Sequence, residues 1–152
     1  TELPRAVLMA GYKDTSSSDA VYMLDWYAYG IGKVPAKVAT TYQNISDAWS
    51  LLIDQKWHDR ITAIKANDGG LSYVEFFEYR KNKMSIPLFN IYCATGSNRE
   101  YYAERTDLIQ LGQTTQAIYF AKLTNEGEQS ELALTGDEIK ARFSLVNQAW
   151  NN

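Results

Sequence analysis

Cysteine is nearly absent from this chain of 152 residues, and its scarcity excludes several kinds of site. The single cysteine, Cys93, excludes an intramolecular disulfide and any metal site built from several thiolates. It lies within the apolar run PLFNIYCAT, which is typical of a buried strand. A cysteine nucleophile needs a nearby histidine, and the sequence holds only one, His58. We therefore interpret Cys93 as a small buried strand residue.

Runs of lysine and arginine are also missing. The chain has 15 basic and 18 acidic residues, which gives a formal net charge of −3. Binding to nucleic acid needs a basic patch that displaces the counterions of the phosphates, so we expect no nucleic-acid partner. The same charge balance argues against electrostatic anchoring to an anionic membrane.

The sequence has no apolar run long enough to span a bilayer, so we expect no transmembrane segment. It also lacks a phosphate-binding glycine loop, a nucleophile elbow and the spacing of zinc ligands. These absences predict a protein without metal or cofactor that is not an enzyme. The chain begins at Thr1 without a methionine, and we expect that a signal or anchor segment has been removed before it.

Aromatic residues, by contrast, are abundant: 11 tyrosines, 4 tryptophans and 5 phenylalanines. Tyrosine suits half-buried pleated surfaces, which indicates a β-rich domain. Residues 72–81 alternate clearly, with Val74, Phe76 and Glu78 on the face opposite to Tyr73. Further strands are expected at residues 5–12, 20–30, 33–43, 57–68, 85–95, 108–114 and 116–123, and a short helical segment at 44–53 with Ser46 as its N-cap.

The clearest helix signal lies at residues 135–150. Thr135 and Glu138 form a capping box, and Ile139, Phe143 and Trp150 belong to an apolar stripe at helical spacing. The predicted fold is α+β, with an antiparallel, aromatic-rich sheet of about six to eight strands and this helix packed on one face. We expect a single domain, with an N-terminal hairpin region at 1–43 and an α/β core at 44–152.

The segment KWHDR (56–60) holds the only histidine. In a strand, Trp57 and Asp59 would share one face, and His58 and Arg60 the other. A general base needs a positioned partner and a pocket, and no motif around His58 supplies either. We therefore predict the start of a strand, with Trp57 buried and His58 in water.

A second segment, REYYAER (99–105), carries the predicted binding patch: Arg99, Tyr101, Tyr102 and Arg105. Tyrosine and arginine dominate the energetic hot spots of protein interfaces. The plainer interpretation is that one tyrosine folds under the loop while the other is exposed.

From residue 44 onward, the features follow a recognisable order. Trp57 opens a strand, an aromatic strand follows at 73–79, then PLF-I at 87–91, and LGQT…AIYFAKL (111–123) leads into the last helix. This order resembles domains of unassigned function in exported lipoproteins and envelope proteins of clostridia and related Firmicutes, and is loosely similar to PsbP-like folds. The resemblance implies an exported, extracellular or envelope location and supplies no catalytic residue.

Residues 7–24 are faintly similar to an FG-GAP-type unit. Serines replace most of the acidic ligands in DTSSSD (14–19), and the loop glycine is missing, so we interpret this segment as a hairpin loop rather than a calcium site.

Taken together, these features predict a non-catalytic binding or structural domain of an exported envelope protein, whose partner is a protein or a cell-wall component. Two alternatives remain open. One is an immunity or inhibitor protein that binds a basic partner. The other is a small hydrolase that uses His58.

Overall fold

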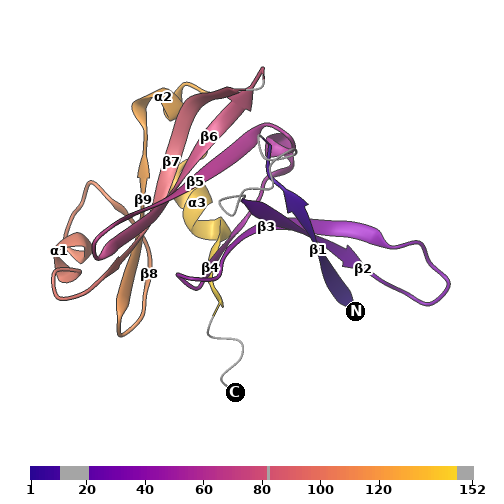
Figure 1. The fold of residues 1–152 in the computed structure, drawn as a ribbon, viewed down its shortest axis with the longest axis horizontal. Helices are drawn as coiled ribbons and strands as arrows, with labels where there is room; N and C mark the ends of the chain where they lie inside the picture. Colours follow the sequence, from indigo (N-terminus) through magenta and orange to yellow (C-terminus); the bar gives the residue numbers. More distant parts are fainter. Residues whose placement is uncertain (11–20, 82, 147–152) are drawn as a thin grey trace.

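The computed structural model describes residues 1–10, 21–81 and 83–146, and it contains two five-stranded antiparallel sheets (Figure 1). The first sheet has the strand order β1(Glu2–Leu8), β2(Tyr22–Ala28), β3(Ala36–Asn44), β4(Trp49–Leu52) and β10(Phe143–Leu145). The second sheet has the order β5(Ile61–Asp68), β6(Leu71–Arg80), β7(Lys83–Thr95), β9(Ala117–Leu123) and β8(Ile109–Gln113). The expected antiparallel, mostly β architecture is confirmed, but the expectation of one sheet is wrong.

Helices are few and short. They are the 3-10 helix η1(Gln55–Trp57) and the α-helices α1(Glu100–Ala103), α2(Asn125–Glu128) and α3(Gly136–Arg142). Among the described residues, the longest helix has seven residues, far fewer than a membrane-spanning helix needs.

The last helix begins where predicted and ends earlier. Both hydrogen bonds of the capping box between Thr135 and Glu138 are present. However, Phe143 has an extended backbone and starts β10, which pairs with β4 through Phe143 and Leu51. The Phe143 ring stacks on the Trp49 ring, with the two centroids 5.8 Å apart. This tertiary contact of Phe143 favours a strand here and outweighs the helical preference of the local sequence. The predicted position of Trp150 lies outside the described residues.

The helical segment expected at 44–53 is also wrong. These residues form the end of β3, a turn and β4. The Ser46 hydroxyl caps no helix and donates to the Asn44 side chain at 2.9 Å. Trp49 and Leu51 are fully buried and alternate with more exposed residues, which is the period of two expected of a strand with one face in the core.

The main core lies between the two sheets. Its largest fully buried side chains include Trp49, Tyr42, Trp57, Phe76 and Phe89. The Tyr42 ring on β3 meets the Phe76 ring on β6 edge to face at 5.4 Å, which links the first sheet to the second. By contrast, β1 is almost entirely exposed, and Figure 1 shows β1, β2 and β3 reaching away from the second sheet.

Candidate functional site

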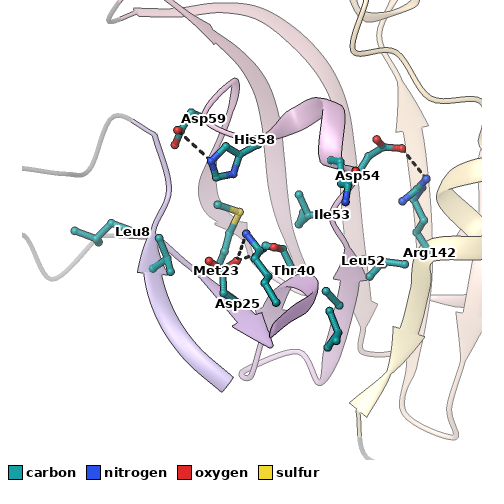
Figure 2. A pocket seen from close by; sticks show the side chains of 15 residues that line it. Leu8, Met23, Asp25, Thr40, Leu52, Ile53, Asp54, His58, Asp59 and Arg142 are labelled. Atoms are coloured by element: carbon teal, nitrogen blue, oxygen red, sulfur yellow. Dashed lines mark hydrogen bonds and ion pairs between the residues drawn. The ribbon is translucent and has the colours of Figure 1, made fainter. Parts of the chain in front are cut away.

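The candidate site is an open groove of about 730 Å³ in the first sheet, beside β3 (Figure 2). Apolar and charged residues line it together: Val7, Leu8, Met23, Asp25, Lys37, Val38, Ala39, Thr40, Leu52, Ile53, Asp54, Gln55, His58, Asp59 and Arg142. We call it the β3 groove. Its volume falls within the range of about 300–1,000 Å³ that is usual for ligand sites.

The groove exists because β3 is longer than its neighbour β4. Pairing with β4 covers only residues 41–44 of β3, and one further hydrogen bond joins the Ile53 amide to the Thr40 carbonyl oxygen at 2.8 Å. The chain then turns away into η1, whose first turn is capped by the Asp54 carboxylate. Residues 36–39 of β3 are therefore left without a neighbouring strand on that side within the described part of the chain.

Apolar side chains give the groove its lining. Met23 and Ile53 are buried, while Val38 and Leu52 are exposed to solvent. A partner that covers Val38 and Leu52 would remove apolar surface from water, which is the main favourable term in most associations.

Two ion pairs and one contact between a histidine and an aspartate lie among these apolar side chains. The Lys37 Nζ lies 2.9 Å from an Asp25 oxygen, and Arg142 lies 2.7 Å from Asp54. At the rim, the His58 Nε2 lies 3.3 Å from an Asp59 oxygen (Figure 2). Because each carboxylate faces a basic group, the groove presents both donors and acceptors without a large excess of either charge.

The most buried of these carboxylates belongs to Asp25. Its burial by itself raises the pKa, but hydrogen bonds from Thr40 and Lys37, with the nearby charges of Lys37 and His58, outweigh it. The pKa of Asp25 is therefore held below its ordinary value. The Thr40 hydroxyl donates to this carboxylate at 2.7 Å, so it is engaged in holding Asp25.

His58 lies in a turn and not in a strand. It follows η1 directly, and the strand β5 begins only at Ile61, so the predicted strand start is wrong. The predicted orientation is confirmed: Trp57 is fully buried, and 68% of the His58 side chain is exposed. Asp59 has a φ of 56°, a left-handed conformation that aspartate tolerates.

The described lining of the groove offers few groups that could serve in covalent catalysis. Among the described lining residues, the only hydroxyl is that of Thr40, which is bound to Asp25. His58 has a carboxylate beside it, but both side chains are largely exposed to water. An activated nucleophile with a fixed base is thus missing from the described lining.

The predicted patch at 99–105 lies on α1 and the loop after it, against the second sheet, and does not reach the β3 groove. Arg99 donates to the carbonyl oxygens of Gly96 at 2.7 Å and Thr115 at 3.1 Å, so it holds two loops together. The Tyr102 ring stacks on Phe120 with centroids 5.0 Å apart.

Tyr101 is the exposed member of the patch. The Arg105 guanidinium lies 5.7 Å from its ring centroid and also pairs with Asp107. A shallow hollow beside it is lined by Ser97, Asn98, Tyr101 and Tyr102. One tyrosine is folded under and the other is exposed, which leaves Tyr101 and Arg105 as the surface that a partner could reach.

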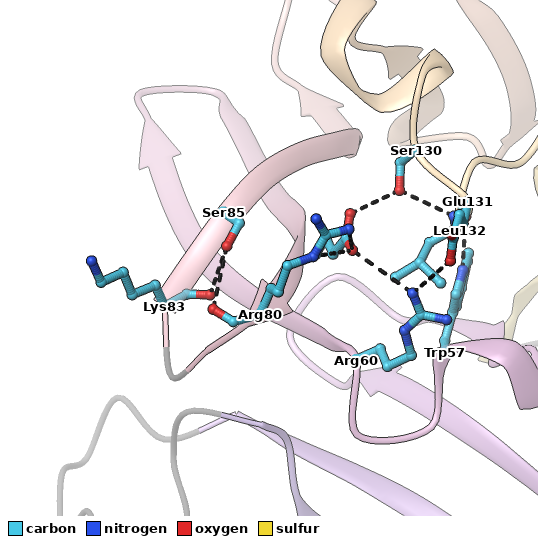
Figure 3. A network of polar contacts seen from close by, with 9 residues as sticks. Trp57, Arg60, Arg80, Lys83, Ser85, Ser130, Glu131 and Leu132 are labelled. Carbon is cyan, nitrogen blue, oxygen red and sulfur yellow. Dashed lines mark hydrogen bonds and ion pairs between the residues drawn. The ribbon is translucent and has the colours of Figure 1, made fainter.

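A third polar cluster surrounds Glu78 and has a structural role (Figure 3). The Glu78 carboxylate is buried and accepts hydrogen bonds from Arg80 at 2.6 Å and from Ser130 at 2.9 Å. Arg60 bridges the same carboxylate to Glu131. The bond to Ser130 ties β6 to the loop before α3. Because both carboxylate oxygens of Glu78 already accept hydrogen bonds, the cluster offers no open binding site.

Sequence reasoning missed the pair of Asp25 and Lys37. A signal was present, because Asp25 interrupts the apolar strand YMLDWYA on the same face as the buried Met23. Such a residue calls for a partner, and Thr40 lies opposite it in the β2–β3 register.

In the described ranges, no three histidine, cysteine, aspartate or glutamate side chains lie close enough together to hold a metal ion. No protein-family model, curated protein or solved structure matches this chain. The resemblance to envelope lipoprotein domains therefore stays a prediction.

Proposed function

We propose that this protein is a non-catalytic binding domain whose β3 groove holds a short segment of a partner protein. The observation that carries the proposal is the groove itself, an open hollow of about 730 Å³ in which apolar side chains lie between neutralised ion pairs.

A polypeptide segment has the chemistry that fits this lining. An aliphatic side chain of the partner would pack against the exposed Val38 and Leu52, and its backbone amides and carbonyls would meet the side-chain amide of Gln55. Such mixed lining, mostly apolar with a few polar groups that fix orientation, is usual for binding sites.

The proposal includes an exported, envelope location for the domain. This part rests on the resemblance of residues 44–152 to envelope proteins and on the cysteine-poor, β-rich composition.

Selection from a phage-displayed random peptide library tests the binding function. Synthetic copies of enriched peptides are then measured by fluorescence anisotropy against the wild type, Val38→Glu and Leu52→Glu. We expect both variants to bind at least about tenfold more weakly, because each places a charge in the apolar lining.

The matched control is Met84→Glu. Met84 is 50% exposed on β7 and Val38 is 51% exposed on β3, so the two changes are alike except for their place. The proposal fails if no peptide is enriched, or if enriched peptides bind Val38→Glu as tightly as Met84→Glu.

A second candidate function, a small hydrolase, rests on His58 at the rim of the same groove with Asp59 at 3.3 Å. Turnover of an ester or glycoside panel that disappears in His58→Ala would favour it over simple binding. Absence of turnover, or equal turnover in that variant, removes this candidate.

A further inference from the structure

The turn between β2 and β3 exposes an unusual set of side chains. We call residues 29–34 the hairpin tip. The Lys33 amide donates to the Gly30 carbonyl oxygen at 3.2 Å, and Gly32 has a φ of 71°. A positive φ at this third position of a turn is the reason that glycine is required there.

The side chains carried by this turn are aliphatic. Ile31 is 104% exposed and Val34 is 88% exposed, and Tyr29 beside them is also exposed. Turns at protein surfaces are usually built from glycine, proline, asparagine, aspartate and serine. Single exposed apolar residues are ordinary, but three within six residues form a surface that favours contact with another apolar phase.

The hairpin presents the tip away from the rest of the protein. Figure 1 shows the turn after β2 at the far end of the first sheet from the second sheet. Ala28 pairs with Ala36 at its base, and the Tyr29 amide donates to the Thr1 carbonyl oxygen at 2.9 Å. The exposed side chains thus sit on a hydrogen-bonded base.

The charge of the tip is positive, unlike that of the whole chain. The tip contains Lys33 and no acidic residue, and Lys37 follows it in β3. Lys37 is neutralised by Asp25, whereas Lys33 makes no ion pair among the described residues. One unneutralised cation therefore lies between Ile31 and Val34.

We propose that the hairpin tip inserts into the surface of a lipid bilayer that contains anionic headgroups. Ile31 and Val34 would enter the boundary of the acyl chains, as the apolar residues of interfacial segments do. Tyr29 suits the headgroup level, and Lys33 would extend its charge to an anionic lipid.

The composition favours a lipid surface over a protein cleft. Lysine is depleted at protein interfaces and valine is rare among their hot spots, and the tip has no tryptophan or arginine, two of the residues that hot spots favour. Its one aromatic residue, Tyr29, suits a headgroup layer as well as a protein surface. The net charge of −3 argues against electrostatic anchoring of the whole domain, so insertion of the aliphatic side chains carries the binding and the charge of Lys33 only assists it. The same net charge opposes close approach of the remaining surface, which confines the contact to the tip and orients the domain at the bilayer.

Co-sedimentation with vesicles tests this proposal. The wild type is mixed with vesicles of phosphatidylcholine alone and of phosphatidylcholine with phosphatidylglycerol. We expect binding that increases with phosphatidylglycerol and that falls about tenfold or more in Ile31→Asp and Val34→Asp, since each variant loses an aliphatic side chain that the bilayer would bury.

The control is Ile45→Asp. Ile45 is as exposed as Val34, at 88%, but lies in the turn between β3 and β4. Its variant should bind vesicles like the wild type, and circular dichroism should show all four proteins equally folded. The chain already holds four tryptophans, so the spectrum of the wild type is subtracted from that of Ile31→Trp. The difference emission should shift to shorter wavelength with vesicles, as the new tryptophan enters an apolar layer.

Two results overturn the proposal: the wild type stays in the supernatant with both vesicles, or Ile45→Asp loses as much binding as Ile31→Asp. If the first result is found and Ile31→Asp also weakens binding of the selected peptides, the tip is a protein contact. Val38→Glu and Leu52→Glu should leave vesicle binding unchanged, which separates this test from that of the β3 groove.

Discussion

The indole nitrogen of Trp57 donates a hydrogen bond of 2.8 Å to the carbonyl oxygen of Leu132, across 75 residues of sequence. Both side chains are fully buried. This contact fastens η1, and with it one wall of the β3 groove, to the loop that precedes α3. The stability of the fold and the shape of the groove therefore depend on the same residue.

Replacing Trp57 tests this link. Trp57→Phe keeps an aromatic ring but leaves the Leu132 carbonyl oxygen buried without its donor, and we expect a loss of about 1–3 kcal/mol in the free energy of unfolding. Urea denaturation measures it. Trp26→Phe is the control, since the Trp26 indole donates at 2.9 Å to the half-buried Thr41 hydroxyl, which can turn to water. Equal losses in the two variants would contradict the role of the buried contact.

The buried carboxylate of Glu78 should contribute more to the free energy of unfolding than the exposed carboxylate of Glu131. Glu78→Gln removes the charge that faces Arg80 and Arg60, and we expect a loss of about 1–3 kcal/mol. Glu131→Gln removes an exposed partner of the same Arg60 and should cost less than about 1 kcal/mol. Thermal or urea unfolding of both variants compares them, and a larger loss in Glu131→Gln would overturn this view of the network.

Acid should weaken the fold partly through Asp25. Its folded pKa lies below the ordinary value of 3.8, so its stabilising contribution is complete above that value and is lost as the pH falls through the folded pKa. Urea unfolding at a series of acidic pH values should therefore show a smaller loss of stability in Asp25→Asn than in the wild type. Lys37→Met should move the acid transition to higher pH. An unchanged acid transition in both variants would show that the pair of Asp25 and Lys37 is not the source of the acid sensitivity.

Cys93 should resist alkylation in the native protein. The thiol is buried, and burial raises its pKa to about 11, so it stays protonated at neutral pH. We expect no reaction with iodoacetamide at pH 8 in buffer and complete reaction in urea, measured by mass spectrometry. Rapid labelling in buffer would mean that the strand β7 opens readily.

The two tyrosines of the predicted patch should separate by function. Tyr102→Ala removes a ring that stacks on Phe120 and should cost about 2 kcal/mol or more of stability. Tyr101→Ala should change stability by less than about 0.5 kcal/mol, because its side chain is exposed. If binding to a peptide or a cell-wall fraction survives Tyr101→Ala, the patch is not a recognition surface.

Local patterns predicted several elements well because they depend on near neighbours. The alternation of Tyr73, Val74 and Phe76 placed β6, and the capping box placed the start of α3, since it involves only residues within one turn. The burial of Trp57 followed from its size and apolar surface. The candidate site was not predicted. Residue types at 99–105 suggested a recognition patch there, whereas the β3 groove is formed by residues from distant parts of the chain.

The amino-acid sequence by itself determined a β-rich chain, a buried Cys93 and Trp57, an exposed His58 and the first turn of α3. Tertiary structure alone decided that the strands divide into two sheets, that α3 ends at Arg142 and that residues 44–53 pair as strands. The β3 groove belongs to this second group. Periodicity shows which face of a strand is apolar, but the choice of neighbouring strand depends on contacts between residues far apart in the chain. The groove opens because β4 pairs with only part of the longer β3, and such pairing is decided by the tertiary structure.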